Sequence, residues 1–466
     1  LSRRQRQMCI RDSFSRVNYT FANKYVIEGT IRADGSSRFD PDHRWGWFPG
    51  VNAAWRVGEE GFMKRLGWFE DLKVRASYGE MGNQSGIGLY DYIQLISLSN
   101  DYYPFGAGVK GQMATSGNII STSRTWETIQ TTNVGFDFST LNNRLYGSFD
   151  YFWKENKNML IPKTYPSMLG ADAPSTNSGH LSIHGWEISL GWRDQIKDFS
   201  YSVRFNISDA KNKVVDRVGS NLIKLGNNET PTGYPLNSYF GYEFDGIIQN
   251  EQELEAYKSR FSEGGIPGDL SVGDAMYKDL DGDGKLSVLG DGKEGSGDVK
   301  YLGDKNPRYN FGFNLSMAWK GFDLSAFIQG VGRRTMFLEG ESRCPMPEAW
   351  YQSAEYWYGK TWTPERTDAQ YPAITLKDKR NYNYYVSTNT KFNVAYARLK
   401  NLQFGYTIPQ TLTSKAGLQK VRVYFSGEDL FEVHNTPNGW DPEENSGSIT
   451  SYPFTRNYSF GINVVF

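Results

Sequence analysis

The residues best suited to site chemistry lie in one short acidic stretch, Asp279-Leu280-Asp281-Gly282-Asp283-Gly284-Lys285. Three carboxylates stand at alternate positions, a glycine allows a sharp turn, and the backbone carbonyl of Lys285 offers a further oxygen. Carboxylates this close repel one another unless a cation lies between them. We therefore predict a structural Ca²⁺ site at Asp279, Asp281, Asp283 and Lys285 that stiffens a long loop. The alternative is a solvated acidic turn.

The carboxylate that would complete this site must come from further along the chain. An EF-hand loop has Glu at its twelfth position, where this sequence has Gly290. Asp291 and Asp298 are the two candidates for the missing ligand. No motif indicates an organic cofactor.

Two aromatic clusters are candidates for contacts with a ligand or a partner. Flat amphipathic rings suit sugar faces and peptides, and both clusters fall in segments that we expect to be extracellular loops. The alternatives are an interfacial girdle, packing within the loops, or a surface that faces a partner protein. The candidate residues are Tyr102, Tyr103, Phe105, Trp350, Tyr351, Trp357 and Trp362.

Catalytic chemistry has little support in the sequence. The four histidines lie far apart except for His180 and His184, which have Gly179 and Gly185 beside them. Helical geometry is not expected there, so turn residues are a better interpretation than a metal site. No nucleotide-binding loop or nucleophile elbow is present. We predict that the protein is not an enzyme.

The elements that position these residues are predicted to be strands with one apolar and one polar face. Side chains of a strand alternate between its two faces, and alternating runs of about ten residues are typical of membrane strands around a wet lumen. We count about fourteen such segments. A soluble β-sandwich or propeller is disfavoured because Arg, Lys, Asp and Asn occupy one face of nearly every run. The clearest run has Phe311, Phe313, Leu315, Met317 and Trp319 on its apolar face.

The C-terminal segment repeats this pattern and ends on an aromatic residue. Its alternate positions are small or polar, except for Val465. Such a segment is typical of the last strand of an outer-membrane barrel, which closes the barrel and faces lipid. The apolar row consists of Tyr458, Phe460, Ile462, Val464 and Phe466.

Composition and connection lengths agree with a barrel. The mean hydropathy is -0.59, and no stretch approaches the ~18–20 consecutive apolar residues of a membrane helix. The net charge of -1, without a basic block, argues against nucleic-acid binding. Short turns at 141–144 and 320–321 contrast with long connections at 101–124, 209–239, 251–305 and 334–390.

Several motifs carry a resemblance to a known family. They include Arg32-Ala33-Asp34-Gly35-Ser36-Ser37-Arg38-Phe39, Asn306-Pro307-Arg308-Tyr309, Trp362-Thr363-Pro364-Glu365 and Arg398-Leu399-Lys400-Asn401. In combination they resemble the SusC/RagA family of TonB-dependent outer-membrane transporters, from Phe14 to Phe466. The resemblance implies import of oligosaccharides or peptides across the outer membrane of a Gram-negative, Bacteroidetes-like cell. It also implies a SusD-like surface lipoprotein as partner and energy from the inner-membrane TonB complex.

The sequence also departs from that family. No plug domain or TonB-contacting segment is recognised, and about fourteen strands fall short of the ~22 of a plugged barrel. We therefore interpret residues 14–466 as all-β, the C-terminal portion of an antiparallel transmembrane β-barrel of about 22 strands with long extracellular loops. Residues 1–13 lack both the apolar core of a signal peptide and strand alternation. We interpret them as a non-native or artefactual segment, with a barrel loop as the alternative.

Three classes of function stay open on the sequence. The first is an energised transporter, the barrel part of a SusC/SusD-like complex. The second is a passive porin or a barrel-borne enzyme. The third is a secreted calcium-binding, adhesin-like β protein. The substrate cannot be read from the sequence, because specificity in such barrels depends on loops, plug and partner together.

Overall fold

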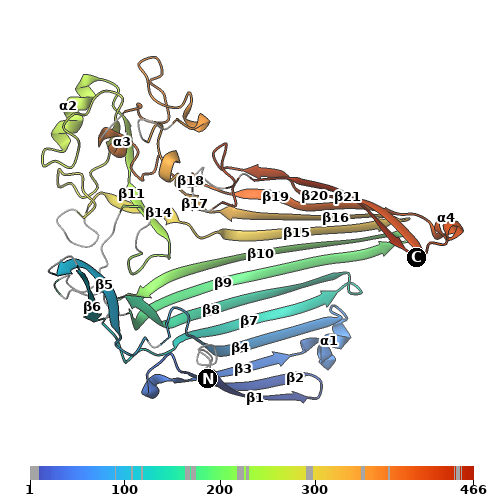
Figure 1. The fold of residues 1–466 in the computed structure, drawn as a ribbon. Coiled ribbons are helices and arrows are strands. Elements are labelled where there is room, and N and C mark those ends of the chain that lie inside the picture. The colour runs from blue at the N-terminus through green and yellow to red at the C-terminus, as the bar shows by residue number, and fades with distance from the viewer. Residues whose placement is uncertain are drawn as a thin grey trace. The chain divides into compact units, whose positions relative to one another are not determined.

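Thirteen strands form one large sheet in the computed structural model. The structure describes residues 10–89, 91–105, 109–116, 119–162, 168, 175–217, 225–226, 230–289, 297–347, 352–375, 378–444, 447, 452 and 454–466. Within them the strand order of the large sheet is β1-β2-β3-β4-β7-β8-β9-β10-β15-β16-β19-β20-β21 (Figure 1). The prediction of a large antiparallel sheet is confirmed, with thirteen strands in place of about fourteen.

The strands of this sheet are long, as expected of elements that cross a bilayer. They are β1 (Ile10–Phe21), β2 (Tyr25–Ser36), β3 (Trp45–Trp55), β4 (Asp71–Asn83), β7 (Glu127–Thr140), β8 (Leu145–Pro162), β9 (Ser175–Ile196), β10 (Phe199–Asp216), β15 (Arg308–Trp319), β16 (Phe322–Arg333), β19 (Tyr396–Thr407), β20 (Lys420–His434) and β21 (Asn457–Val465). Strand β1 includes Ile10–Ser13, which pair with Ala33–Ser36. These four residues were not expected to be a strand; the origin of residues 1–13 stays a prediction.

The chain divides into two compact units. The first comprises Leu1–Thr140, Ser148–Trp186 and Lys211–Asn221, and the second comprises Leu141–Gly147, Glu187–Ala210 and Leu222–Phe466. In the described part of the chain, no helix is long and apolar enough to span a membrane.

In the first unit, an ion-pair cluster lies on the polar face of the sheet. Arg75 of β4 lies 2.9 Å from Asp137 of β7 and 2.7 Å from Asp150 of β8. A small apolar core packs beside the strands, where Trp126 is buried and donates its indole N–H to the carbonyl of Arg44 at 2.9 Å. Arg75, Asp137 and Asp150 thus pair their charges within the sheet itself.

In the second unit, the register of the strands aligns their apolar residues in rows. Phe313 of β15 pairs with Phe205 of β10 on one side and with Ile328 of β16 on the other. Directly paired residues of an antiparallel sheet project to the same face. The strand predicted across residues 309–319 is therefore present, with its apolar side chains on one face.

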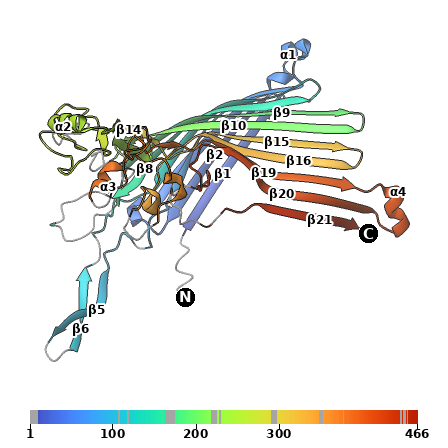
Figure 2. The ribbon, with the colours of Figure 1, turned by 90° about the horizontal axis from the view of Figure 1, so that it is seen from above.

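Short and long connections lie at opposite ends of the strands in the second unit. Strands β15 and β16 are joined by Lys320-Gly321, which have positive φ angles of 44° and 90°, as a two-residue hairpin turn requires. Figures 1 and 2 show α4 (Gln410–Thr413) at one end of β19 and β20, and α2 (Glu251–Arg260) and α3 (Asp378–Asn383) at the other. The long connections contain all the candidate residues of this unit except the terminal strand.

These long connections have secondary structure and cores of their own. Small two-stranded sheets pair β11 (Ser238–Tyr242) with β14 (Val299–Asp304), β12 (Phe244–Ile247) with β13 (Ala275–Tyr277), and β17 (Thr335–Met336) with β18 (Phe392–Asn393). The connection from β4 to β7 in the first unit contains the hairpin of β5 (Ile96–Phe105) and β6 (Val109–Ser116) and follows α1 (Gly61–Leu66) and β4 along the chain.

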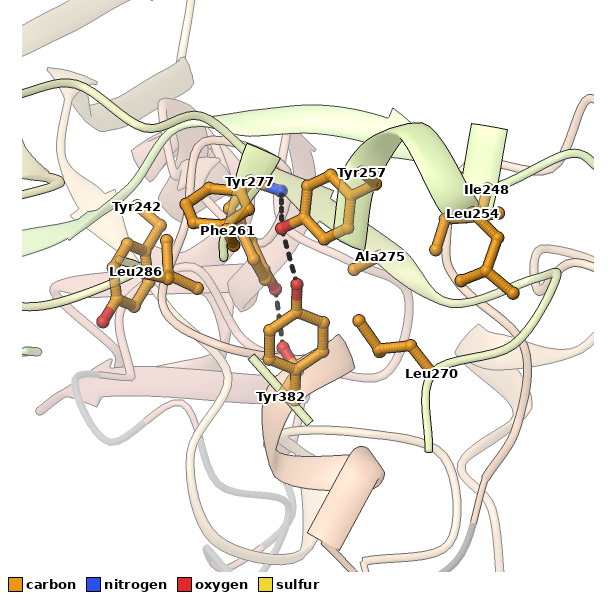
Figure 3. Close-up of a cluster of buried hydrophobic side chains, with 10 residues drawn as sticks. All are labelled: Tyr242, Ile248, Leu254, Tyr257, Phe261, Leu270, Ala275, Tyr277, Leu286 and Tyr382. Carbon is orange, nitrogen blue, oxygen red and sulfur yellow. Dashed lines mark hydrogen bonds between the residues drawn. The ribbon is translucent and has the colours of Figure 1, made fainter. Parts of the chain in front are cut away.

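Buried tyrosines hold the largest of these cores together. Tyr257 of α2 and Tyr382 of α3 share a hydrogen bond between their hydroxyls, 2.7 Å long (Figure 3). The backbone N–H of Tyr277 donates to the Tyr257 hydroxyl at 3.0 Å, and the Tyr277 hydroxyl donates to the Tyr382 carbonyl at 2.7 Å. The polar tip of each ring is satisfied, so the aromatic bodies can be buried without an unpaired hydroxyl.

Several glycines of the sheet lie beneath a large ring of a neighbouring strand. A Cβ atom on Gly461 of β21 would lie 2.4 Å from the Tyr424 side chain of β20, and one on Gly191 of β9 would lie 2.3 Å from Tyr146 of β8. No residue with a side chain fits at these two positions while the ring stays in place. The alternation of glycine with aromatic residues thus reflects packing across strands.

Candidate ligand and metal sites

The acidic stretch folds as a compact turn with its carboxylates together. One oxygen from each of Asp279, Asp281 and Asp283 lies within 4.8 Å of the others. The Asp279 carboxylate accepts hydrogen bonds from the backbone N–H groups of Gly282 at 2.6 Å and Gly284 at 3.0 Å. Both glycines have positive φ angles, 77° and 76°, which residues with a side chain adopt at a cost. The three oxygens are thus close enough together for one hard cation to contact all of them.

Asp298 acts on the same turn from outside this cluster. Its buried carboxylate accepts from the backbone N–H of Leu280 at 2.6 Å and of Ser287 at 2.8 Å. Burial raises the pKa of the Asp298 carboxyl, and the charges of Asp281 and Asp279 act in the same direction, although the two backbone hydrogen bonds oppose them. In the structure Asp298 ties the two ends of the turn together, and its role as a ligand stays a prediction. Asp291 lies outside the described residues.

The turn is anchored to the tyrosine core. Leu286 is buried in that core, and its backbone N–H donates to the Gly264 carbonyl at 3.1 Å. The N–H of Glu263 donates in turn to the Gly284 carbonyl at 3.0 Å. These hydrogen bonds connect the acidic turn to the segment that follows α2, so a change in the conformation of the turn would also affect that segment.

The aromatic residues of the connection between β16 and β19 separate into buried and exposed sets. Trp357 is buried in a second core with Tyr356 and Tyr371, whose hydroxyls are hydrogen-bonded at 2.6 Å. Trp362 is half-buried and donates its indole N–H to the Gln249 side chain at 3.1 Å. Tyr358, between them in sequence, is 89% exposed. Packing within the loops, one of the alternatives considered above, describes Trp357.

The remaining aromatic candidates are not resolved by this geometry. Trp350 and Tyr351 lie outside the described residues. Tyr102, Tyr103 and Phe105 belong to β5, but their side chains lie outside the described part of the chain. Their contacts with a ligand or partner stay predictions.

A pocket of about 310 Å³ lies where residues 354–360 meet residues 438–440. Glu355, Tyr358 and Lys360 line it from the first segment, and Asn438 and Trp440 line it from the second. The ammonium of Lys360 lies 3.5 Å from the centre of the Tyr356 ring, within the range of a cation–π contact. The pocket thus combines an exposed ring, a cation and hydrogen-bonding side chains.

A buried arginine holds the second wall of this pocket in place. Arg398 of β19 is fully buried and forms ion pairs with Glu432 at 3.0 Å, Asp441 at 2.8 Å and Glu443 at 3.0 Å. Arg334 adds hydrogen bonds to the carbonyls of residues 442 and 444 at 2.6 and 2.9 Å. We call residues 441–444 with these two arginines the arginine clamp. Because it fixes residues 441–444, it also positions Asn438 and Trp440.

The terminal strand is present as predicted from its alternation. Phe460 pairs with Phe425 of β20, with ring centres 5.2 Å apart, and Ile462 pairs with Val423. On the other face Asn463 pairs with Arg422. Phe466 follows the last residue of β21 and is 82% exposed. The contact of this row with lipid stays a prediction.

The interpretation of His180 and His184 as turn residues is wrong. Both lie within β9. Glycine suits position 179 of this strand because the Ile161 side chain fills the space that a side chain there would occupy. Strand positions four apart are separated by about 13 Å, too far to share one metal ion. His180 instead lies 2.5 Å from the Glu155 carboxylate.

Comparison with known proteins identifies the fold. The family described as TonB dependent receptor-like, beta-barrel, matches residues 3–430. The chain belongs to this family. TonB-dependent receptor P3 of Formosa agariphila is 32% identical over 97% of this chain and 45% of its own length. TonB-dependent receptor SusC of Bacteroides thetaiotaomicron is 27% identical over 97% of this chain and 43% of its own length.

A solved structure, that of the RagAB peptide transporter, has the same fold. It superposes with a TM-score of 0.77 at 23% identity, and the match covers 98% of this chain and 47% of that one. The resemblance to the SusC/RagA family is therefore confirmed, as is an outer-membrane location for this receptor barrel. The chain spans about half the length of the relatives it matches.

Sequence reasoning missed several residues that the structure of this receptor brings together. Lys360 and Asn438 belong to segments almost eighty residues apart, and neither stands in a recognisable motif. Arg398 was noted only as part of a family motif. The one available signal was the acidic run Asp441-Pro442-Glu443-Glu444, because clustered carboxylates favour cations nearby.

Proposed function

We propose that the protein to which this chain belongs imports nutrient oligosaccharides or peptides across the outer membrane, driven by the TonB complex. A SusD-like surface lipoprotein would assist at the extracellular side, where the long connections would lie. The protein would act as a transporter and not as an enzyme. Membership of the TonB-dependent receptor family carries this proposal, and the similarity to SusC supports the nutrient class.

The wall of the barrel supports transport through its lumen. Charged groups on the polar face of the strands are paired with one another, as in the Arg75 cluster and in Arg422 with Asp323 at 2.9 Å. A wall of balanced charges holds a passing solute weakly, which transport requires. Selectivity would then depend on the long connections.

Uptake by whole cells tests the proposal. Deleting the full-length gene should abolish growth on, and uptake of, the nutrient that induces it, and deleting the TonB complex should have the same effect. Uptake that persists without TonB would favour the passive porin and contradict an energised transporter. Loss of uptake on deleting a neighbouring gene for a SusD-like lipoprotein would support the partner.

We also propose that Asp279, Asp281 and Asp283 bind one structural Ca²⁺, with the Lys285 carbonyl as a further ligand. Three carboxylate oxygens within 4.8 Å of one another favour this, since their repulsion is relieved by a divalent cation. A final carboxylate would come from Asp291 or from a rearranged Asp298. The ion would stiffen the turn that is anchored to the tyrosine core.

Calorimetric titration of the full-length protein in detergent tests the metal site. After treatment with a chelator, the parent protein should take up one Ca²⁺, and Asp281→Ala should abolish this uptake. Asp368→Ala, which changes an exposed carboxylate elsewhere in the loops, should leave uptake unchanged. Equal Ca²⁺ uptake by the two variants, or no uptake by the parent protein, would contradict the proposed metal site.

A further inference from the structure

Lys360 lines the pocket and forms no ion pair with any residue that the structure describes. Its ammonium rests on the Tyr356 ring at 3.5 Å, and among the described residues no carboxylate forms an ion pair with it. Burial lowers the pKa of this ammonium. By contrast, Arg398 and Lys400 nearby each contact two or more carboxylates. The free charge of Lys360 is therefore available to an anionic group of a ligand.

Tyr358 offers a flat surface beside this cation. Its side chain is 89% exposed, more than is usual for tyrosine, whose burial is intermediate among residue types. The backbone is fixed, because Tyr358 donates its N–H to the Glu355 carbonyl at 3.0 Å and Lys360 donates to the Trp357 carbonyl at 3.1 Å. The exposed Tyr358 ring therefore belongs to a hydrogen-bonded turn and not to a frayed segment.

The other side chains of the pocket are hydrogen-bonding groups. The Glu355 carboxylate and the Asn438 amide both line it and are exposed. The Glu355 carboxylate accepts well from hydroxyl donors, whereas it would repel any anionic group of a ligand beyond the one that Lys360 neutralises. One cation and one acceptor in the same pocket suit a ligand with a single negative charge and several hydroxyls.

Both walls of the pocket are rigid before any ligand arrives. Tyr356, under Lys360, is packed against the Trp440 ring at a centre distance of 6.0 Å. Trp440 donates its indole N–H to the Gly447 carbonyl at 3.1 Å. The arginine clamp then holds residues 441–444. A preformed site loses little conformational entropy on binding.

We propose that this pocket is a subsite for an acidic sugar residue of an oligosaccharide ligand. The sugar carboxylate would meet Lys360, one face of the ring would stack on Tyr358, and hydroxyls would donate to Glu355 and Asn438. The volume of about 310 Å³ is at the lower end for small-molecule sites and suits one sugar unit of a longer chain. The inference rests on the proposed import function and narrows its substrate to uronate-containing glycans. A peptide carboxylate could also meet Lys360, but the exposed ring and the hydroxyl acceptors favour a saccharide.

Binding measurements on the full-length protein in detergent test this subsite. The probes are short oligosaccharides of galacturonate, of alginate and of glucuronate, each with its carboxyl-reduced neutral counterpart, and an acidic tripeptide. The parent protein should bind at least one uronate probe more tightly than its neutral counterpart. Lys360→Met should weaken that binding about tenfold or more (~1.4 kcal/mol per tenfold), and Lys360→Arg should restore most of it.

Two further variants distinguish the site from a general charge effect. Tyr358→Ala should weaken the binding of the uronate probe and of its neutral counterpart to the same extent, since stacking on the ring does not depend on charge. Lys415→Met, at an exposed lysine in the turn Ser414–Ala416, should leave binding unchanged. Uronate binding that is equal in the parent and Lys360→Met, or no binding of any uronate probe, would overturn the subsite. Binding of the tripeptide alone, lost in Lys360→Met, would overturn the saccharide assignment. Failure of the import function would show separately, as binding in detergent without uptake by cells.

Discussion

Replacing Arg398 with Met should release residues 441–444 from the sheet. The guanidinium is fully buried and lies within 3.0 Å of carboxylate oxygens of Glu432, Asp441 and Glu443. Met fills much of the same space, so the change removes charge more than volume. The carboxylates would then have to be desolvated without their common partner.

The loss of local stability in Arg398→Met depends on which other cation each carboxylate still contacts. Glu432 retains Arg456 at 2.9 Å, and Glu443 retains Lys400 at 3.1 Å, whereas Asp441 has no second cation among the described residues. Removing one partner of a buried pair costs roughly 3–5 kcal/mol. Because the side chain of Asp441 is itself 19% exposed, we expect about 2–3 kcal/mol, concentrated on the segment that carries it.

Hydrogen–deuterium exchange of the full-length protein in detergent measures this local cost. Peptides from residues 435–444 should exchange roughly 30- to 150-fold faster in Arg398→Met, while those from the strands far from the clamp stay protected. Arg456→Met is the matched control, because Arg456 is 44% exposed and pairs with one carboxylate. It should accelerate exchange by less than about fivefold. Equal effects of the two variants, or none in Arg398→Met, would show that the segment is held by something other than the arginine clamp.

Three other outcomes are expected. Deleting Phe466, or replacing it with Asp, should reduce membrane insertion of the full-length protein far more than Asn463→Asp, as measured by heat-modifiability on gels. The deletion removes the last ring of the apolar row and Phe466→Asp puts a charge there, whereas position 463 belongs to the polar face; equal insertion would mean that the faces are misassigned. Tyr382→Phe should lower the free energy of unfolding of the loop core by about 1 kcal/mol, measured by thermal denaturation, whereas Tyr452→Phe at an exposed ring should not change it. Burial raises the pKa of the Tyr257 hydroxyl from 10.0 to about 12. The stabilisation that this core gains from burying the neutral hydroxyl should therefore be complete below pH ~10 and decline as the pH rises towards 12. Tyrosinate absorbance would report the ionisation, and ionisation of Tyr257 near pH 10 would contradict its burial.

The strands could be predicted from the sequence because their pattern is local. Residues 311–319 alternate without a break, and the structure places them in one strand with the predicted faces. The acidic turn was also visible, since its carboxylates and glycines are consecutive in the chain. Each of these features depends on neighbours within about ten residues.

The pocket could not be predicted because its parts meet only through tertiary packing. Lys360 is distinguished by the Tyr356 ring beneath it and by the absence of an ion pair with the residues that the structure describes. Neither feature is visible in the sequence. Trp357 and Tyr358 are adjacent and similar in type, yet one is buried and the other exposed. The strand at His180 was missed for a related reason. Gly179 resembles a turn signal in the sequence, whereas in the structure Ile161 packs over it and fills the space beside its backbone.

The glycines beneath large rings have a consequence for how this barrel wall can change during evolution. Gly461 and Tyr424 together fill the space that neither fills alone, so a mutation at one position alters what the other position can accept. Serine at position 461 would require the Tyr424 ring to move aside or to be replaced by a smaller side chain, and a small residue at 424 would leave a hollow until position 461 grew. Such positions should therefore be exchanged in pairs along a lineage, and libraries that randomise a barrel wall should vary both members together.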